Sequence, residues 1–284
     1  MIPSSFDYVA PTTVDDAVSA LAQAGEDAKV IAGGQTLMPV LRLRLAAPTV
    51  LVDLGRIDEL RGVREDGDSL VIGAMTTYYD LLRNPLVSKH ALLLAEATHT
   101  VADPQIRHRG TLGGNLAHAD PAGDLSAPVL ALEATLTAAG PSGRRSIPAA
   151  EFFVDYFTTA LQPDEILTEV RMPKHTDWAA RYEKLHRVAQ AWSIVAVAAT
   201  VEVDGGIVRQ ARIALTNMAS VPVRARGVEE ALVGQTASEE LIRAAAEHAA
   251  EGVDPMSDGN ADADYRGHLA RVLTRRAVAT AAGV

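Results

Sequence analysis

The sequence of 284 residues contains no cysteine. This absence excludes disulfides, thiolate nucleophiles, zinc ribbons and any cysteine-ligated iron–sulfur cluster within the chain. If electrons pass through an iron–sulfur cluster, a partner chain must therefore carry that cluster.

Positive charge is also scarce. The chain has 26 lysines and arginines against 36 aspartates and glutamates, a net charge of −10. The only lysines are Lys29, Lys89, Lys174 and Lys184. Because no basic stripe is available, nucleic acid and anionic membranes are not expected as partners.

Long apolar runs are missing as well. None approaches the ~20 residues that a membrane-spanning helix needs. The first seven residues lack the basic and apolar regions of a signal peptide. With 48% hydrophobic residues, the chain is expected to be globular, large enough for two domains, and cytoplasmic, with a peripheral position on the inner membrane face left open.

Three common site motifs do not occur. No Gly-Lys-Ser/Thr follows a glycine pair, which excludes a P-loop, and no G-x-G-x-x-G supports a Rossmann site. No Ser/His/Asp arrangement suggests a hydrolytic triad.

Two glycine pairs are present instead, in Ala32-Gly33-Gly34-Gln35-Thr36-Leu37 and in Gly110-Thr111-Leu112-Gly113-Gly114-Asn115. Paired glycines let another molecule approach the backbone closely, and successive N–H groups in such turns form anion-binding concavities. We interpret the two turns as facing each other and holding one diphosphate. For the first pair, an ordinary strand-to-helix turn is an equal alternative.

A polar loop, residues 119–124, follows the second pair. Asp120 and Asp124 could bind ribose or ribityl hydroxyls, or could serve as a turn residue and as the cap of a helix through Leu132. A metal site with His118 is disfavoured, because no second histidine stands at ligand spacing. Arg107 and Arg109 are either surface charges or counter-charges to the diphosphate.

The chain divides into three parts by pattern. Residues 1–56 predict a small α/β unit, with a helix that starts at Val14 after a Thr13 cap and ends at Gly25. The pattern over residues 57–175 predicts both strands and helices. The predicted strands are 60–64, 69–74, 133–139, 144–147 and 166–171. The predicted helices are 77–82 and 86–98. From residue 176 the pattern predicts an α+β domain, with three antiparallel strands (181–187, 193–203, 207–215) and helices on one face (238–251, 263–281).

Several motifs in the same order resemble one known family. They are the two glycine segments, Ala102-Asp103-Pro104-Gln105-Ile106-Arg107, Asp120-Pro121-Ala122-Gly123-Asp124, Glu165-Ile166-Leu167-Thr168, Tyr182-Glu183-Lys184-Leu185, Leu215-Thr216-Asn217 and Asp264-Tyr265-Arg266. Over essentially its whole length the chain resembles the FAD-binding medium subunits of the molybdenum hydroxylase (xanthine dehydrogenase) family, and most closely those of aerobic carbon monoxide dehydrogenases.

The resemblance implies an α+β fold. An FAD-binding domain over 1–175, with subdomains 1–56 and 57–175 of the type found in vanillyl-alcohol oxidase, would precede a C-terminal flavoprotein domain over 176–284. The FAD is expected to be noncovalent, since Gln35 stands where related proteins often have histidine and the chain has no cysteine. The implied cofactor-binding residues are Ala32, Gly33, Gly34, Gln35, Thr36, Leu37, Val101, Ala102, Gly110, Thr111, Gly113, Gly114, Asn115, Asp124, Leu167, Lys184 and Trp192.

Within that set, the resemblance implies three roles. Residues 32–36 and 111–115 would hold the pyrophosphate through backbone N–H groups and threonine hydroxyls, and Asp124 would contact ribityl or ribose hydroxyls. Leu167 and Lys184 would lie by the isoalloxazine, and Trp192 would stack on it.

The implied function is electron transfer, with no catalytic residue or metal ligand in this chain. A large partner subunit would hold the molybdenum cofactor, and a small one two [2Fe–2S] clusters, in a dimer of heterotrimers. FAD would pass electrons to an external acceptor such as a quinone. Alternatives are a related hydroxylase acting on a heterocycle or aldehyde, a free-standing FAD oxidase, and a scaffold without FAD.

Overall fold

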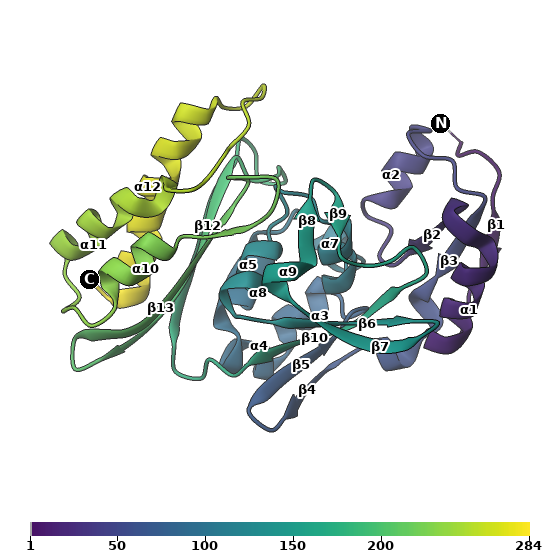
Figure 1. Ribbon diagram of the computed structural model, residues 1–284, viewed down its shortest axis with the longest axis horizontal. Coiled ribbons are helices and arrows are strands. Elements are labelled where there is room, and N and C mark those ends of the chain that lie inside the picture. The colour runs from purple at the N-terminus through teal and green to yellow at the C-terminus, as the bar shows by residue number, and fades with distance from the viewer. Residues whose placement is uncertain (1) are drawn as a thin grey trace.

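The computed structural model describes residues 2–284, and Figure 1 shows an N-terminal unit, a central sheet with helices, and a C-terminal sheet with helices. The N-terminal unit is a parallel three-stranded sheet in the order β1-β3-β2 with two helices. Its elements are β1 (Asp7–Val9), α1 (Val14–Ala24), β2 (Ala28–Ile31), α2 (Leu37–Arg42) and β3 (Val50–Asp53). Thr13 caps α1 by accepting from the Asp16 N–H, and Gly25, with a φ of 72°, ends it. The predicted first helix is confirmed.

The central sheet is antiparallel, in the order β4-β5-β10-β6-β7. Leu60 is buried in a short 3₁₀ turn, η3 (Asp58–Leu60), so the strand predicted from residue 60 begins three residues later. The strands are β4 (Val63–Asp66), β5 (Ser69–Gly73), β6 (Thr135–Gly140), β7 (Gly143–Pro148) and β10 (Ile166–Pro173), with a separate small pair β8 (Phe153–Asp155) and β9 (Thr158–Thr159).

Helices cover one side of this sheet: α3 (Tyr78–Arg83), α4 (Pro85–His90), α5 (Leu92–Thr100), α6 (Pro104–Arg107), α7 (Leu112–His118), α8 (Ser126–Ala131) and α9 (Ala149–Phe152). The single helix predicted over 86–98 is wrong. Ala91, at φ −143° and ψ 49°, breaks it into α4 and α5. His90, at the break, is buried, and its Nδ1 lies 2.6 Å from the Thr176 hydroxyl.

The C-terminal sheet has four strands, not the predicted three: β11 (Ala179–Leu185), β12 (Val195–Asp204), β13 (Ile207–Thr216) and the short β14 (Val223–Arg224). Its helices are α10 (Arg226–Leu232), which was not predicted, α11 (Glu239–Ala246) and α12 (Ala263–Ala282). The remaining 3₁₀ turns of the chain are η1 (Gly25–Asp27), η2 (Leu54–Arg56) and η4 (Glu247–Ala250).

Strand β12 is buried on both faces. Val195 and Val197 belong to the core formed with α10–α12, whereas Ala196 and Ala198 belong to the core of the central part. Because successive side chains of a strand point to opposite faces, the C-terminal sheet has its own helices on one face and the central helices α5 and α8 on the other. The C-terminal half is therefore packed onto the central part through a continuous apolar layer.

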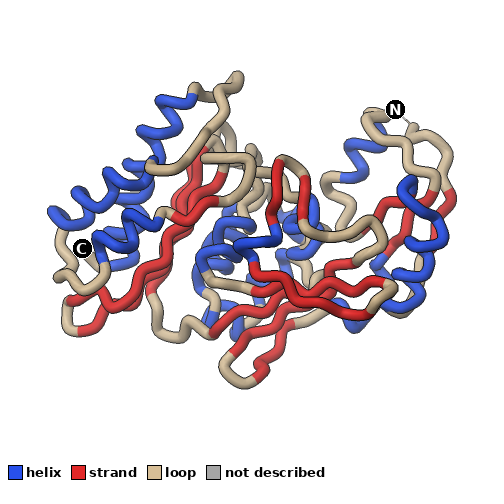
Figure 2. The backbone as a smooth tube through the Cα atoms, in the orientation of Figure 1, coloured by secondary structure: helices blue, strands red, loops and turns tan. Residues whose placement is uncertain are grey.

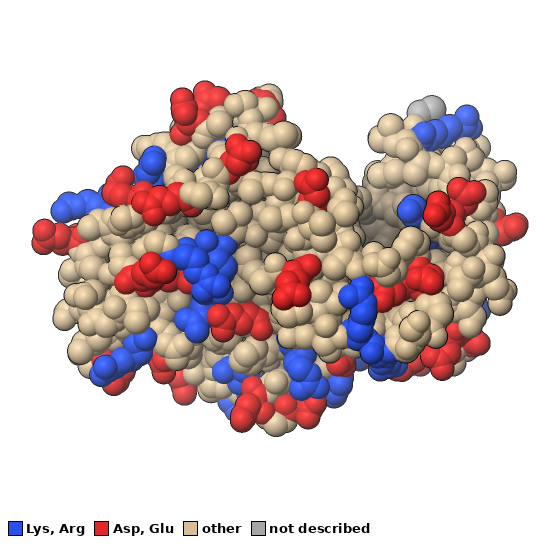
Figure 3. Space-filling model, viewed as in Figure 1, with Lys and Arg blue, Asp and Glu red and all other residues tan. Residues whose placement is uncertain are grey.

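Figure 2 shows the N-terminal unit at one end of the molecule and the C-terminal helices at the other. On the face shown in Figure 3, positive and negative side chains are interspersed rather than separated. Across residues 2–284, no helix combines the length and the apolar character needed to cross a membrane. The longest helix, α12, carries four arginines.

Candidate functional site: a pocket between two glycine turns

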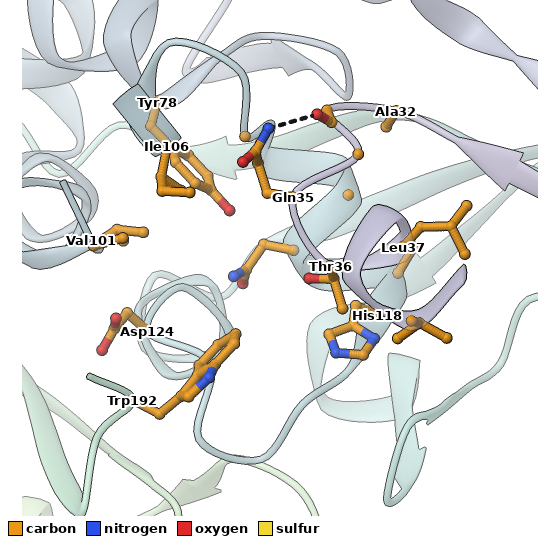
Figure 4. A pocket seen from close by; sticks show the side chains of 18 of the residues that line it. Ala32, Gln35, Thr36, Leu37, Tyr78, Val101, Ile106, His118, Asp124 and Trp192 are labelled. Atoms are coloured by element: carbon orange, nitrogen blue, oxygen red, sulfur yellow. Dashed lines mark hydrogen bonds between the residues drawn. The ribbon is translucent and has the colours of Figure 1, made fainter. Parts of the chain in front are cut away.

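A cavity of about 690 Å³ lies where the N-terminal unit, the central helices and the C-terminal part meet. This volume falls within the usual range for ligand pockets. Figure 3 shows a hollow beside the N-terminal unit, and Figure 4 shows the side chains inside the pocket. Thr36, Leu37 and His118 lie on one side of it, and Asp124 and Trp192 lie on another.

The two glycine turns do face each other. A Cβ built on Gly33 would lie 2.2 Å from the Arg109 carbonyl oxygen and 2.9 Å from Gly110 Cα, so only glycine allows this backbone contact. Gly34 has a φ of 74°, in the left-handed region. Gln35 folds back, and its Nε2 donates to the Gly33 carbonyl at 3.0 Å (Figure 4).

The first turn presents free donors. Among the described residues, none accepts a hydrogen bond from the backbone N–H groups of Gly33, Gly34, Gln35, Thr36 or Leu37. Thr36, although it precedes α2, makes no capping hydrogen bond with its side chain. Five successive unpaired N–H groups beside a pocket form an anion-binding concavity.

The second turn is built differently, because residues 112–118 are helical and not a loop. The N–H of Leu112 donates to the Thr76 carbonyl at 3.0 Å, that of Gly113 to the Ala74 carbonyl at 2.8 Å, and that of Gly114 to Thr111 Oγ1 at 3.1 Å. The donors of this turn are thus used inside the protein. The expected pyrophosphate contacts through these N–H groups do not match this arrangement.

Most of the predicted cofactor residues line the pocket: Ala32, Gly33, Gly34, Gln35, Thr36, Leu37, Val101, Ala102, Gly110, Gly114, Asn115, Asp124 and Trp192. Four others do not. Thr111 caps α7, Gly113 packs on Ala74, Leu167 is buried in the central core, and Lys184 lies behind Asp124.

Asp124 does not cap a helix, which excludes one of the two alternatives for this residue. Helix α8 begins without a side-chain cap. The Asp124 carboxylate instead accepts from Tyr182 Oη at 2.9 Å, Ser193 Oγ at 2.7 Å and Lys184 Nζ at 2.7 Å. Burial raises the pKa of the Tyr182 phenol well above its usual value, so this hydroxyl is a neutral donor.

The arginines that flank the second turn are not in the pocket. The Arg107 guanidinium donates to the carbonyls of Val101 and Ala102, at 2.8 and 3.3 Å, and so braces a bend in which Ala102 has a φ of 42°. The basic side chains that line the pocket are Lys29 and His118. Burial lowers the pKa of His118, while Asp120, 3.8 Å away, opposes that shift.

One buried acceptor in the pocket has no partner. Asn115 Oδ1 is inaccessible to water and makes no hydrogen bond with any described residue. Tyr78, next to it in the lining, is buried, which raises the pKa of its phenol. A buried acceptor without a donor is costly.

Sequence reasoning missed several lining residues. Tyr78, Phe157, Gln190 and Ala191 belong to none of the motifs, although the last two directly precede Trp192. Within residues 2–284, no three His, Cys, Asp or Glu side chains gather as they would around a metal ion.

Family models match nearly the whole chain. The FAD binding domain in molybdopterin dehydrogenase matches residues 4–175, and the CO dehydrogenase flavoprotein C-terminal domain matches residues 180–281. The chain therefore belongs to the family of molybdopterin dehydrogenase flavoprotein subunits defined by these two domains.

The chain is also similar to individual proteins along nearly its whole length. The chain is 43% identical to the carbon monoxide dehydrogenase medium chain of Hydrogenophaga pseudoflava, over 98% of this chain and 97% of the relative. Its structure superposes on that of a carbon monoxide dehydrogenase from the same organism with a TM-score of 0.96 at 44% identity, covering 99% and 98% of the two chains. It is also 38% identical to the 6-hydroxypseudooxynicotine dehydrogenase complex subunit alpha of Paenarthrobacter nicotinovorans, over 99% and 96%.

Proposed function

We propose that this chain is the FAD-binding, electron-transferring subunit of an aerobic carbon monoxide dehydrogenase. The resemblance of its motifs, the two matched family models and the relatives at about this chain's own length support the proposal. The single observation that carries the site is the row of five unpaired backbone N–H groups at residues 33–37, all of which belong to residues that line a pocket of about 690 Å³.

In this proposal the first turn binds the diphosphate of FAD. Its N–H groups and the Thr36 hydroxyl donate to the phosphate oxygens, whereas the second turn closes the other side through Gly110 and Gly114. Asn115 and Asp124, which also line the pocket, lie on the side proposed for the ribityl and ribose hydroxyls. Trp192, half-exposed at the pocket, stacks on the flavin ring.

The remaining predicted residues act at the ring. Lys184 directs its ammonium toward the flavin from behind Asp124, and Leu167 packs behind the site. Bound FAD supplies the ability to accept electrons singly and deliver them in pairs, and the chain's own residues position and tune it. The division into an FAD-binding domain, 1–175, and a C-terminal domain, 176–284, is part of the proposal.

The electrons come from partner subunits. We place a molybdenum-containing large subunit and a small subunit with two [2Fe–2S] clusters beside this chain, in a dimer of heterotrimers, with a quinone as the final acceptor. The chain has no cysteine for a cluster of its own. The assembly is proposed to be cytoplasmic and peripheral to the inner membrane face.

A second candidate is a related hydroxylase that oxidises a nitrogen heterocycle, which the 38% identity to the subunit from Paenarthrobacter nicotinovorans favours. The substrate is bound by another chain in either case, so the two candidates differ in the partner and not in this pocket.

Native purification from the source cells tests the proposal. Co-purification with a large and a small subunit, together with FAD, iron and molybdenum, and reduction of the flavin by carbon monoxide are expected. Flavin reduction by a heterocycle but not by carbon monoxide would favour the second candidate. A lone yellow protein that consumes oxygen with its own substrate, or a colourless one, would contradict both.

A further inference from the structure

Four polar side chains form a buried cluster behind the pocket wall. Asp124 and Lys184 are almost fully buried, with 5% and 3% of their side chains exposed. Tyr182 and Ser193 are equally inaccessible, at 3% and 2%. A carboxylate has about four lone-pair positions. Three of them are taken by these donors, and Asp124 also lines the pocket.

The donors come from a different part of the chain than the acceptor. Asp124 follows α7 in the central part, whereas Tyr182 and Lys184 lie two apart on β11, on the same face of the strand. Ser193 lies two residues before the start of β12 and directly follows Trp192. Every described side chain that donates to Asp124 therefore belongs to the C-terminal half.

The backbone at Ser193 is itself held in place. The Asn217 amide donates to the carbonyls of Ser193, at 2.8 Å, and Ile194, at 3.2 Å. The buried Arg266 guanidinium also donates to the Ile194 carbonyl. Asn217 has a φ of 61°, and its own N–H donates to Pro121 in the Asp124 loop at 2.9 Å. These hydrogen bonds fix the backbone at Ser193 and Ile194, and they thereby orient the Ser193 hydroxyl toward Asp124.

We propose that Tyr182 and Ser193 are positioning residues for the cofactor. Their hydroxyls hold the Asp124 carboxylate at the pocket wall and offset its charge, and through Asp124 they fix the Lys184 ammonium and the start of the Trp192 loop beside the flavin. This inference rests on the proposed FAD site and deepens it.

The electrostatic consequence has a definite sign. A buried carboxylate that loses a hydrogen-bond donor exposes more of its negative charge to its surroundings. Electrons added to a flavin beside it are then less stable. Loss of either hydroxyl should therefore shift the flavin reduction potential to a more negative value, which a purely structural role would not do.

The test uses the full chain loaded with FAD. Ser193→Ala and Tyr182→Phe each remove one hydroxyl. Each is expected to weaken FAD binding about tenfold, since a hydrogen bond to a charged group is lost, and to make the flavin potential more negative. In an Asp124→Asn background, Ser193→Ala should produce no further shift, because Ser193 acts through Asp124.

Two matched controls are available. Ser126 is a buried serine whose hydroxyl has no partner among the described residues, so Ser126→Ala removes no hydrogen bond. Tyr8→Phe removes a tyrosine-to-aspartate hydrogen bond, to Asp53, outside the pocket. Both controls should leave the FAD dissociation constant and the potential at wild-type values.

Wild-type affinity and potential in both hydroxyl variants would overturn the inference. A wild-type chain that binds no FAD, alone or with its partners, would instead overturn the proposed function. That outcome would overturn the inference as well, because without FAD the two hydroxyls have no cofactor to position.

Discussion

Residues 33–37 and residues 111–115 form two glycine turns on opposite sides of one pocket, yet their donors are used differently. The N–H groups of Gly33–Leu37 have no partner among the described residues, whereas those of Leu112, Gly113 and Gly114 bond to Thr76, Ala74 and Thr111. The first turn is therefore available to bind an anion, and the second is a braced helix start that shapes the wall. Similar sequence motifs do not imply similar roles when the surrounding strands differ.

The largest effect is expected at the contact between the turns. In Gly33→Ala the new Cβ would lie 2.2 Å from the Arg109 carbonyl oxygen, which is backbone and cannot move away cheaply. Overpacking of about 1–3 kcal/mol should separate the turns and weaken FAD binding by up to about a hundredfold. Fluorescence titration with FAD measures this. Gly259→Ala, with no atom within 4 Å of the new Cβ, is the control, and an unchanged affinity in Gly33→Ala would refute the facing-turn site.

Substitutions of the two glycines of the second turn should affect the free energy of unfolding and the binding of FAD differently. A Cβ on Gly113 would lie 2.5 Å from the Ala74 Cβ, while one on Gly114 would lie 2.8 Å from the Thr111 hydroxyl oxygen and 3.4 Å from the Cβ of Ala32, which lines the pocket. Gly113→Ala should lower the free energy of unfolding by about 1–3 kcal/mol and leave the affinity of the folded protein unchanged. Gly114→Ala should weaken FAD binding about tenfold. Urea unfolding and FAD titration of both variants measure the contrast, and equal effects on binding would contradict it.

Two threonines, one in each turn, allow the same comparison between the two turns. Thr111 caps α7 through its hydroxyl, whereas Thr36 makes no capping hydrogen bond and lines the pocket. Thr111→Val should cost about 1 kcal/mol of stability with little change in FAD affinity. Thr36→Val should leave stability unchanged and weaken FAD binding about tenfold. If Thr111→Val were the variant that lost FAD, the second turn would be the phosphate site after all.

The smallest effect concerns pH. His118 lies one helical turn after Gly114 on α7, and burial lowers its pKa below the ordinary value of about 6.5. Between the folded-state pKa of His118 and about pH 6.5, the unfolded chain binds more protons at this histidine than the folded chain does. The free energy of unfolding therefore falls as the pH drops through about 6.5. The loss levels off below the folded-state pKa.

The measurement is urea unfolding of the cofactor-free chain between about pH 5 and about pH 8. His118→Asn should flatten the pH dependence in this window. A variant whose pH profile matched the wild type would show that His118 does not titrate differently on folding.

The sequence correctly predicted the elements whose ends depend on neighbouring residues. The cap at Thr13 and the helix end at Gly25 depend on neighbouring residues, and the structure confirms both of them. The break at Ala91 carried no such signal, because no glycine or proline stands within residues 86–98 to mark it. The short α10 and β14 were missed for a similar reason.

The motifs that line the candidate site could be predicted from the sequence, but the hydrogen bonds between Asp124 and distant residues could not. The glycine segments and Trp192 line one pocket, as expected. The partners of Asp124 lie 58, 60 and 69 positions away in the chain, and no pattern near residue 124 announces them. A carboxylate before a helix favours a cap by local rules, and the tertiary contacts overrode that preference here.

The separation of Asp124 from its donors also orders events during synthesis. A ribosome releases Asp124 well before Tyr182, Lys184 and Ser193, and later still Arg266, whose guanidinium holds the Ile194 carbonyl. Domains generally fold from the N-terminus as they emerge, but this pocket wall closes only after the last helix is made. If FAD binds at the proposed site, we therefore expect it to be loaded after α12 has been made, and we expect a chain truncated before α12 to lack it.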